Sequence, residues 1–293
     1  MTVVASSNED TTTLALSQSD RRLSNLRNWY SFTWRPLGSR DDSLLGAIAS
    51  DLKSRAPRIT LDQVPDEDRS ATRLAKAFSA AGWRVEVTRC DTNHILPTNG
   101  RSFAEYWASR PGKLRTTLKR KAKKVETTIF TAFDAEAWES YERIYAASWK
   151  PTEGKPAMLH AFAEQEGKAG RLRLGIAYAA GEPIAAQFWT VESGIAYIHK
   201  LAHLESHKQV SAGTTLSAAL FEHVIDQDRV TLVDFGTGDE PYKNDWMEAV
   251  RPRYQVDCLN MRSPRAWLDL GRLALGRLRA PNVPELAREP RSG

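Results

Sequence analysis

The chain has 293 residues, of which 41% are hydrophobic and 26% are charged, and its formal net charge is +5 at pH 7. These values describe a globular protein with one large domain or two domains of ordinary size. No run approaches the roughly 18–20 apolar residues of a transmembrane helix, and the start of the chain shows no secretory signal. Two cysteines, Cys90 and Cys258, are too few for a disulfide framework or a cysteine zinc site. We therefore expect a cytoplasmic protein without a metal.

Residues 1–21 are polar and rich in Thr and Ser, which predicts a disordered N-terminus. From there to residue 97, apolar residues recur at helical and strand spacing in turn, which is typical of a small α/β domain. The elements predicted within this domain, 22–97, are strands at 28–34, 58–61 and 83–90 and helices at 42–54 and 67–81.

The densest positive charge lies in Lys113–Lys124, which holds seven Lys or Arg residues and no acid. As a helix, this segment places Leu114, Leu118, Ala122 and Val125 on one stripe. Two interpretations stay open: a solvated helix packed by that stripe, or a contact for an anionic substrate, a membrane surface or RNA. No aromatic residue lies within the run, which argues against single-stranded nucleic acid, and we expect no DNA partner.

Residues 98–262 show a longer series after the basic segment, in the order β-α-α-β-β-β-α-β-α-β. The predicted strands are 126–133, 172–178, 183–191, 195–203, 230–235 and 254–260, and the predicted helices are 135–147, 157–166, 213–225 and 244–250. Residues 263–293 are predicted to form an amphipathic C-terminal helix, with Trp267, Leu270 and Leu278, and a loose tail.

The most informative segment is Val233–Trp246, where a buried strand runs into a loop broken by Gly236 and Gly238. The polar side chains of this loop are Asp239, Glu240, Tyr242 and Lys243. An acid, a base and a phenol together at the end of a strand are typical of a functional site. Upstream, small residues in Ser211–Leu216 open an amphipathic helix and leave backbone N–H groups free to face an anion. These features predict a group-transfer enzyme that holds a phosphate-bearing donor.

The element order of 98–262 resembles that of the GNAT acetyltransferase superfamily. The motifs that carry the resemblance are Pro183–Trp189, Ala196–Ala202, Ser211–Thr214 and Asp234–Lys243. They are similar to the BioF2-like or CelD-like acetyltransferases, which are related to the FemAB peptidoglycan-bridge transferases. The resemblance covers residues 100–262 and implies an α/β fold with a GNAT-like mixed sheet in 98–262. It also implies that 22–97 form a shortened, degenerate GNAT-like half with a smaller sheet of its own.

The same resemblance implies that acetyl-CoA or another acyl-CoA is the co-substrate, with its pyrophosphate at the start of a helix. The residues that would bind it are Gln209, Ser211, Ala212, Gly213, Thr214 and Thr215. Ala212 and Thr214 stand where the family motif has Gly and Gly or Ala, so the identity of the donor stays open. A plain helix cap formed by Ser211 or Thr214 is the alternative interpretation.

Catalytic groups are predicted on the strand 195–203 and in the loop that follows residue 235. Strand alternation places Tyr197, His199, Leu201 and His203 on one face and Lys200 on the other. A neutral His199 or His203 can act as general base, because the ordinary imidazole pKa is about 6.5. The resemblance implies that Tyr242 is the general acid for a departing thiolate, and Glu240 is a further candidate base acting through water.

The predicted substrate-binding residues are Trp149, Lys150, Asp239 and Lys243. Trp149 and Lys150 match a Ser-Trp-Lys element of the family and would line the site of the acceptor. The alternatives are a Trp149 that is simply packed and a loop that is held together by a local Glu240–Lys243 pair.

The leading hypothesis is an acyltransferase that moves an acetyl or longer acyl group from CoA to an amine, without a covalent enzyme intermediate. The resemblance alone suggests the acceptor, a small molecule or saccharide such as an amino sugar of envelope polysaccharide assembly. Two alternatives stay open. One is a FemAB-like transferase that uses aminoacyl-tRNA. The other is a non-catalytic GNAT scaffold that binds a peripheral membrane surface or a polysaccharide-assembly partner.

Overall fold

The computed structural model describes residues 1–28 and 30–267, in which the chain forms two compact units. Unit 1 combines residues 1–27 and 33–90 with the chain from Tyr254, and unit 2 combines 28–32 with 91–253. Trp267 is described, whereas Leu270 and Leu278 of the predicted C-terminal helix lie outside the described residues. None of the described helices is both long enough and apolar enough to cross a membrane.

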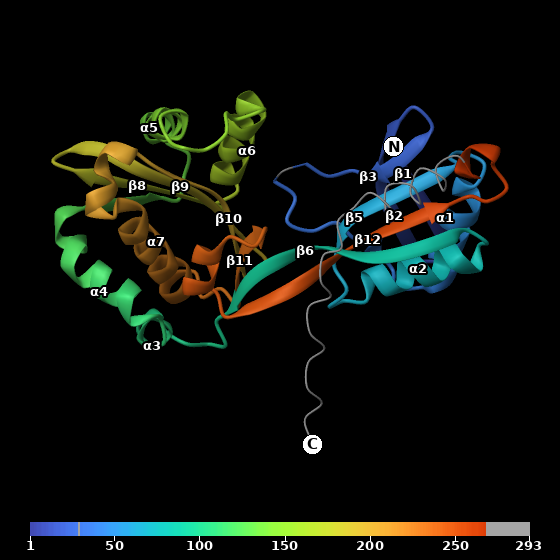
Figure 1. The fold of residues 1–293 in the computed structure, drawn as a ribbon, viewed down its shortest axis with the longest axis horizontal. Coiled ribbons are helices and arrows are strands. Elements are labelled where there is room, and N and C mark those ends of the chain that lie inside the picture. The colour runs from blue at the N-terminus through green and yellow to red at the C-terminus, as the bar shows by residue number, and fades with distance from the viewer. Residues whose placement is uncertain (29, 268–293) are drawn as a thin grey trace, which may run out of the picture. The chain divides into compact units, whose positions relative to one another are not determined.

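Unit 1 is a sheet on which two helices pack, and its strand order is β1-β2-β3-β5-β12-β6 (Figure 1). Its strands are β1 (Thr2–Ser7), β2 (Asp10–Ser19), β3 (Arg22–Asn25), β4 (Leu37–Gly38) and β5 (Arg58–Val64), together with parts of β6 (Arg84–Pro97) and β12 (Ala249–Leu259). Its helices are α1 (Asp42–Leu52) and α2 (Ser70–Ala80). These helices confirm the two predicted in this part of the chain.

The prediction of a disordered N-terminus over residues 1–21 is wrong. β1 and β2 pair as an antiparallel hairpin, and Leu14 and Leu16 of β2 are fully buried. The polar composition hides an alternation in which Thr12, Leu14 and Leu16 point to one face, which is the period of a half-buried strand. The predicted strand at 28–34 is also wrong, because none of its described residues lies in a strand.

Unit 2 has the strand order β6-β11-β10-β9-β8-β7. Its strands besides β6 are β7 (Glu126–Phe130), β8 (Leu172–Ala179), β9 (Glu182–Glu192), β10 (Ile195–His203) and β11 (Leu232–Thr237). Its helices are α3 (Phe103–Ala108), α4 (Gly112–Lys121), α5 (Ala135–Ala146), α6 (Pro156–Lys168) and α7 (Ala212–Glu222). The predicted order of elements is confirmed through β11, and the helix expected near 244–250 is a short 3-10 turn at Pro241–Asp245.

Helices cover both faces of the sheet in unit 2, as Figure 1 shows, with α5 and α6 on one face and α7 and α4 on the other. Under α7 the core contains Trp189, Leu216 and Phe221, whereas under α5 and α6 it contains Trp138 and Phe188. The expected mixed α/β sheet is therefore confirmed, and each face has its own apolar layer.

The predicted division into two separate sheets, with boundaries at 97/98 and 262/263, is wrong. β6 and β12 each run from one unit into the other, so the hydrogen-bonded strand order is continuous. β12 was expected to end the second sheet, but its residues from Tyr254 pair with β5 of unit 1. A strand can pair with any suitable partner, and this partner lies about 190 positions earlier in the sequence, where no local pattern announces it.

Candidate functional site

Two parallel strands separate at the centre of unit 2. β10 pairs with β11 only from Ile195–Tyr197 to Leu232–Asp234. Beyond this point β10 continues beside β9 as far as His203, and β11 continues beside β6 as far as Thr237. The carboxyl ends of the two strands therefore separate. The segments that follow them include α7 and the loop after β11, and both carry predicted site residues.

A bulge in β10 overturns the predicted alternation of its side chains. The pairing of β10 with β9 shifts between Ile198 and Lys200. As a result His199, which stacks on Phe188, and Lys200, which contacts Tyr145 of α5, face the same side of the sheet. His203 faces α7 instead, since a Cβ placed on Gly213 would lie 3.6 Å from His203 Nδ1. One extra residue in a strand moves the side chains beyond it to the opposite faces.

The start of α7 is an uncapped helix end beside a cation. Ser211 is left-handed (φ 53°) and forms no side-chain cap, so the capping interpretation of Ser211 is wrong. Lys121 Nζ, at the end of α4, donates a hydrogen bond to Ser211 Oγ at 3.2 Å. The first backbone N–H groups of a helix have no acceptor within the helix, and together with the helix dipole they favour an anion.

The other predicted donor-binding residues lie around this helix start. Ala212 and Thr215 are buried, Gly213 and Thr214 are partly exposed, and Gln209 is exposed in the preceding 3-10 turn. Gln187 of β9 donates from Nε2 to the Gly213 carbonyl at 3.1 Å, which anchors the first turn of α7 to the sheet. Gln187 was not predicted as a site residue, because the sequence shows it only as a single polar residue within an apolar strand.

The basic helix α4 fits both interpretations of its charge run. Leu114, Leu118 and Val125 contact the apolar layer under α7, as predicted for the stripe, but α4 ends at Lys121 and Ala122 is not part of this layer. The same packing brings Lys121 to the start of α7. A cation at this position strengthens the anion-binding character of the helix end.

The loop after β11 is held in shape by Lys243. This side chain is buried, and its Nζ donates to the carbonyls of Thr237 at 2.5 Å and Gly238 at 3.3 Å. Nζ also lies 2.8 Å from Glu240 Oε2, so the predicted local Glu240–Lys243 pair is present. Gly238 has a φ of 98°, which a side chain would strain. The contacts of Lys243 therefore serve the loop itself.

At neutral pH Tyr242 is protonated and Glu240 is ionised. Burial, and then the charge of Glu240, raise the pKa of Tyr242 to about 12, although the residue keeps 42% of its surface exposed. The phenol is therefore protonated at neutral pH, as a general acid must be before it transfers its proton. For Glu240, partial burial opposes ionisation, but the ion pair with Lys243 outweighs it and lowers the pKa.

Asp239 has a neighbour that sequence reasoning missed. It is exposed, and its Oδ1 lies 3.4 Å from Nε2 of His94, a buried residue of β6. Asp91, also on β6, accepts a hydrogen bond from Gly238 N at 3.1 Å. β6 comes from a part of the sequence about 140 residues away, and no motif links it to the loop.

His203 and Trp149 come together beside α7. The two rings lie 4.3 Å apart between centroids, and Lys150 Nζ lies 5.2 Å from the Trp149 ring. Burial lowers the pKa of His203, against the opposing charge of Glu205, so the imidazole is neutral at neutral pH. Burial also lowers the pKa of Lys150. Trp149 is half exposed, so it is not simply a packed core residue.

His199 lies in an aromatic environment on the opposite face. Its Nε2 lies 2.8 Å from Thr190 Oγ1, and the rings of Phe188, Phe32 and Phe162 surround it. Burial, and then the charge of Lys200, lower the pKa of His199 to about 3. It is therefore neutral at neutral pH and separated by the sheet from the start of α7.

Lys200 forms a buried cation cluster that the sequence did not indicate. Its Nζ lies 2.8 Å from Glu153 Oε2, donates to Tyr145 Oη at 3.3 Å and lies 5.1 Å from the Tyr30 ring. A lysine this deeply buried needs such partners, since an unpaired charge in the interior is costly. The cluster joins the loop after α5 to β10.

Two networks fix the strands around the loop. Buried Asp234 accepts from Asn93 Nδ2 at 2.6 Å and from Gly236 N at 2.8 Å, and Arg251 donates to it at 3.0 Å.

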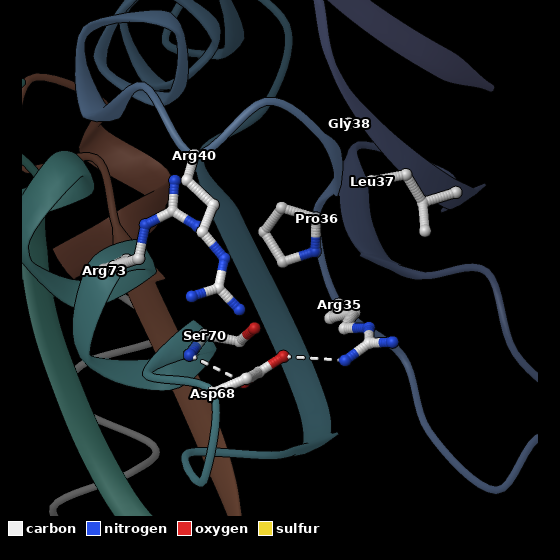
Figure 2. A pocket seen from close by; sticks show the side chains of 8 residues that line it. All are labelled: Arg35, Pro36, Leu37, Gly38, Arg40, Asp68, Ser70 and Arg73. Atoms are coloured by element: carbon white, nitrogen blue, oxygen red, sulfur yellow. Dashed lines mark hydrogen bonds and ion pairs between the residues drawn. The ribbon is translucent and has the colours of Figure 1, made fainter.

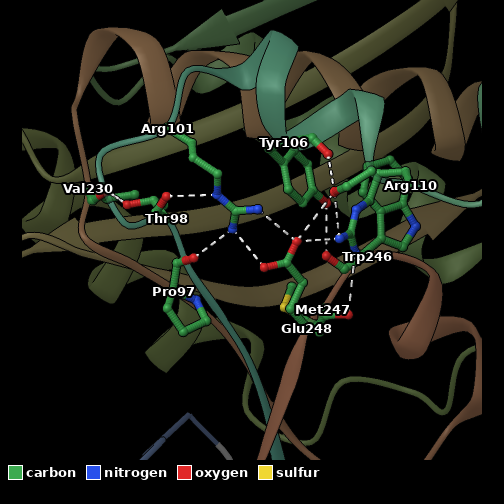
Figure 3. Close-up of polar contacts among 10 residues, drawn as sticks. Pro97, Thr98, Arg101, Tyr106, Arg110, Val230, Trp246, Met247 and Glu248 are labelled. Atoms are coloured by element: carbon green, nitrogen blue, oxygen red, sulfur yellow. Dashed lines mark hydrogen bonds and ion pairs between the residues drawn. The ribbon is translucent and has the colours of Figure 1, made fainter.

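The second network lies where the loop ends. Glu248 binds Arg101 and Arg110, and Tyr106 donates to the Trp246 carbonyl at 2.8 Å (Figure 3). Both ends of the loop are thus anchored.

A comparison with protein families now identifies this part of the chain. Residues 112–244 match the family described as an acetyltransferase (GNAT) domain. Unit 2 contains a GNAT domain. This domain is of the acyltransferase class, and the predicted relationship to the GNAT superfamily is confirmed. No curated protein sequence matches the chain.

Solved structures show the same fold at low sequence identity. FemX is 11% identical, with a TM-score of 0.65, 92% of this chain and 89% of that chain covered. The C-terminal domain of a protein named as a lysylphosphatidylglycerol synthetase, from Agrobacterium fabrum, is 12% identical, with a TM-score of 0.61 and coverage of 90% and 85%. A tandem GNAT protein from the clavulanic acid biosynthesis pathway is 13% identical, with a TM-score of 0.51 and coverage of 84% and 78%. The likeness extends over both units and concerns the fold alone.

Among the residues that the structure describes, no three His, Cys, Asp or Glu side chains gather as ligands of a metal ion.

Proposed function

We propose that the GNAT domain transfers an acyl group, with acetyl as the first candidate, from CoA to an amine. The observation that carries the proposal is the start of α7, where an uncapped helix end and Lys121 lie next to the point at which β10 and β11 separate. The phosphates of CoA would lie over Ser211–Thr215, and the thioester would extend along the free edge of β10.

The chemistry would be a direct attack. The amine nitrogen of the acceptor bonds to the thioester carbonyl carbon, and the bond from that carbon to sulfur breaks. Neutral His203, on the face of α7, takes the proton that the amine loses. Tyr242 gives its proton to the departing thiolate. His203 is preferred over His199 as base, because His199 faces the other side of the sheet among aromatic rings.

The acceptor would enter beside Trp149 and Lys150. An exposed aromatic ring next to a base suits a sugar or another flat polar surface, so an amino sugar is the acceptor that we would test first. This choice rests on the family resemblance.

A FemAB-like transfer from aminoacyl-tRNA is the second candidate. The specific observation in its favour is the basic helix α4, which has no acidic residue and ends at the proposed phosphate site. RNA-dependent activity, abolished by ribonuclease, would favour this candidate over transfer from acyl-CoA.

The test is CoA binding by Gly213→Asp, measured by calorimetry. Aspartate at this position would oppose the phosphates, and we expect affinity to fall at least about 100-fold, which corresponds to roughly 3 kcal/mol. The fold should survive, because an acidic residue in the first turn of a helix is favourable and the nearest atom to the new Cβ is at 3.6 Å. Gly46→Asp on α1, where a Cβ meets nothing within 4 Å, is the matched control. Unchanged affinity in a folded Gly213→Asp protein would refute the placement. A wild-type protein that binds no CoA would instead favour tRNA or a scaffold role.

A further inference from the structure

Unit 1 contains a polar cavity of about 280 Å³ that lies outside the GNAT domain. Its lining includes the arginines Arg35, Arg40 and Arg73, together with Asp68, Ser70 and Gly38. Figure 2 shows Arg40 and Arg73 on one side and Arg35 on the other, with Asp68 and Ser70 between them. Three cations therefore face one carboxylate.

The arginines retain unused hydrogen-bond donors. Arg73 Nε lies 2.7 Å from Asp42 Oδ1, but its buried Nη2 has no hydrogen-bond partner among the described residues. Arg35 Nη1 lies 3.0 Å from Asp68 Oδ2, which leaves its other nitrogens available. Arg40 is exposed and forms no ion pair within the part of the chain that the structure describes. A buried guanidinium nitrogen without an acceptor is costly, and a bound anion would satisfy it.

The backbone that carries Arg35 and Arg40 is fixed. Gly38 has a φ of 93°, and a Cβ there would lie 2.1 Å from the Thr11 carbonyl oxygen, so only glycine fits. Ser39 N donates to that same carbonyl at 2.7 Å, and Thr12 Oγ1 donates to the Ser39 carbonyl at 3.1 Å. The two arginines thus extend from a segment tied to β2, and their convergence is built into the fold.

The helix end next to the cavity is not the binding element. At the start of α2, Asp68 accepts from Ser70 N at 3.0 Å and Asp66 accepts from Thr72 N at 2.8 Å. Recognition must therefore come from guanidinium groups. A planar carboxylate is satisfied by one bidentate arginine, whereas donors that converge from several directions suit a tetrahedral oxyanion.

We propose that this cavity binds a small phosphate monoester through Arg35, Arg40 and Arg73. Its volume exceeds that of a phosphate ion and lies near the lower end of small-molecule sites, which are typically about 300–1,000 Å³. The phosphate contacts the three guanidinium groups, and the organic part occupies the remaining space. The site is independent of the proposed function of unit 2.

The experiment is isothermal titration of the full chain with inorganic phosphate and with glycerol 3-phosphate at constant ionic strength. It is done in the Gly213→Asp background, so that phosphate bound at the start of α7 does not contribute. We expect saturable binding with one site, and tighter binding of glycerol 3-phosphate. Arg40→Gln should weaken it roughly ten- to 100-fold, the effect of one hydrogen bond to a charged group. Arg73→Gln should do the same.

Arg84→Gln is the matched control, since Arg84 is an exposed arginine on β6 in the same unit and outside the cavity lining. Arg40 is itself exposed, so its variant should fold normally, which a thermal melt would check. The proposal is overturned by the absence of saturable binding. An equal loss in Arg84→Gln overturns it as well, because it would indicate a diffuse charge effect. Glycerol 3-phosphate that binds no more tightly than inorganic phosphate overturns the assignment to a monoester.

Discussion

The two units treat the starts of particular helices in opposite ways. In unit 1, Asp41 accepts from Ser43 N at the start of α1, and Asp66 accepts from Thr72 N at the start of α2, both at 2.8 Å. In unit 2, Ser211 precedes α7 and forms no side-chain cap, and Lys121 Nζ lies 3.2 Å from Ser211 Oγ. A carboxylate uses the N–H groups and repels anions, whereas a cation leaves them available. The sign of the neighbouring charge thus separates a structural cap from a helix end suited to an anion.

The units also differ in how they would hold a ligand. Unit 2 offers backbone groups between separating strands, which suits an extended molecule with a reactive end. Unit 1 offers converging arginine side chains around a small volume. The following changes would break or sharpen this comparison.

The largest effect is expected for Tyr242→Phe in unit 2. If Tyr242 protonates the leaving thiolate and this step limits turnover, kcat should fall by about 10²–10⁴-fold. CoA affinity should persist, because the phosphates would be held by α7. Steady-state turnover and CoA titration measure the two quantities. Tyr254→Phe in unit 1 is the matched control, and wild-type kcat in Tyr242→Phe would reduce Tyr242 to a packing role.

His203→Gln tests the other proton transfer. We expect kcat/KM to fall by about 10²-fold. In the wild type, burial lowers the pKa of His203, so the base loses activity only as the pH falls below the ordinary imidazole range. The pH profile of kcat/KM should show this acidic limb, and His203→Gln should lose it. A limb that persists would assign it to another group. His160→Gln, a half-exposed histidine of α6, should leave the profile unchanged.

Glu248→Gln tests the network that anchors the end of the loop in unit 2. It removes a carboxylate shared by Arg101 and Arg110, and we expect unfolding free energy to fall by about 1–2 kcal/mol, allowing for partial exposure. Asp51→Asn breaks an exposed pair in unit 1 and should cost less than about 0.5 kcal/mol. Urea denaturation at neutral pH measures both, and equal costs would contradict this ranking.

The same variant carries a pH test. A hydrogen bond from Arg101 holds the pKa of Glu248 below its usual range, so its stabilisation is present above the unfolded-state pKa. It is lost as the pH falls through the folded-state pKa. The difference between wild type and Glu248→Gln should therefore shrink in acid.

The smallest effect concerns the helix starts themselves. Asp66→Ala should cost about 1 kcal/mol of unfolding free energy, because it leaves Thr72 N without its acceptor. Ser211→Gly should cost little stability, since no cap is lost and glycine tolerates the left-handed backbone. It should instead weaken CoA binding slightly by releasing Lys121. Chemical denaturation and CoA titration check the pair, and a larger stability loss for Ser211→Gly would reverse the comparison.

Much of unit 2 could be predicted from sequence, because its elements follow local periodicity. The strands and helices between residues 126 and 235 appear in the expected order, and the Leu114–Leu118 stripe packs as expected. The candidate site was predicted less completely. The loop after β11 was selected from its residue types, but Lys243 serves the loop, and His94 beside Asp239 comes from β6.

The sequence by itself determined the order of the strands and helices between residues 126 and 235, that a polar loop follows a buried strand at Phe235, and which superfamily the second half resembles. These properties depend on residues a few positions apart. The tertiary structure decided that β12 pairs with β5, that the bulge turns Lys200 and His203 to opposite faces, and that Arg35, Arg40 and Arg73 meet at one cavity. Such features depend on strand register and on contacts between distant segments, which local periodicity does not encode.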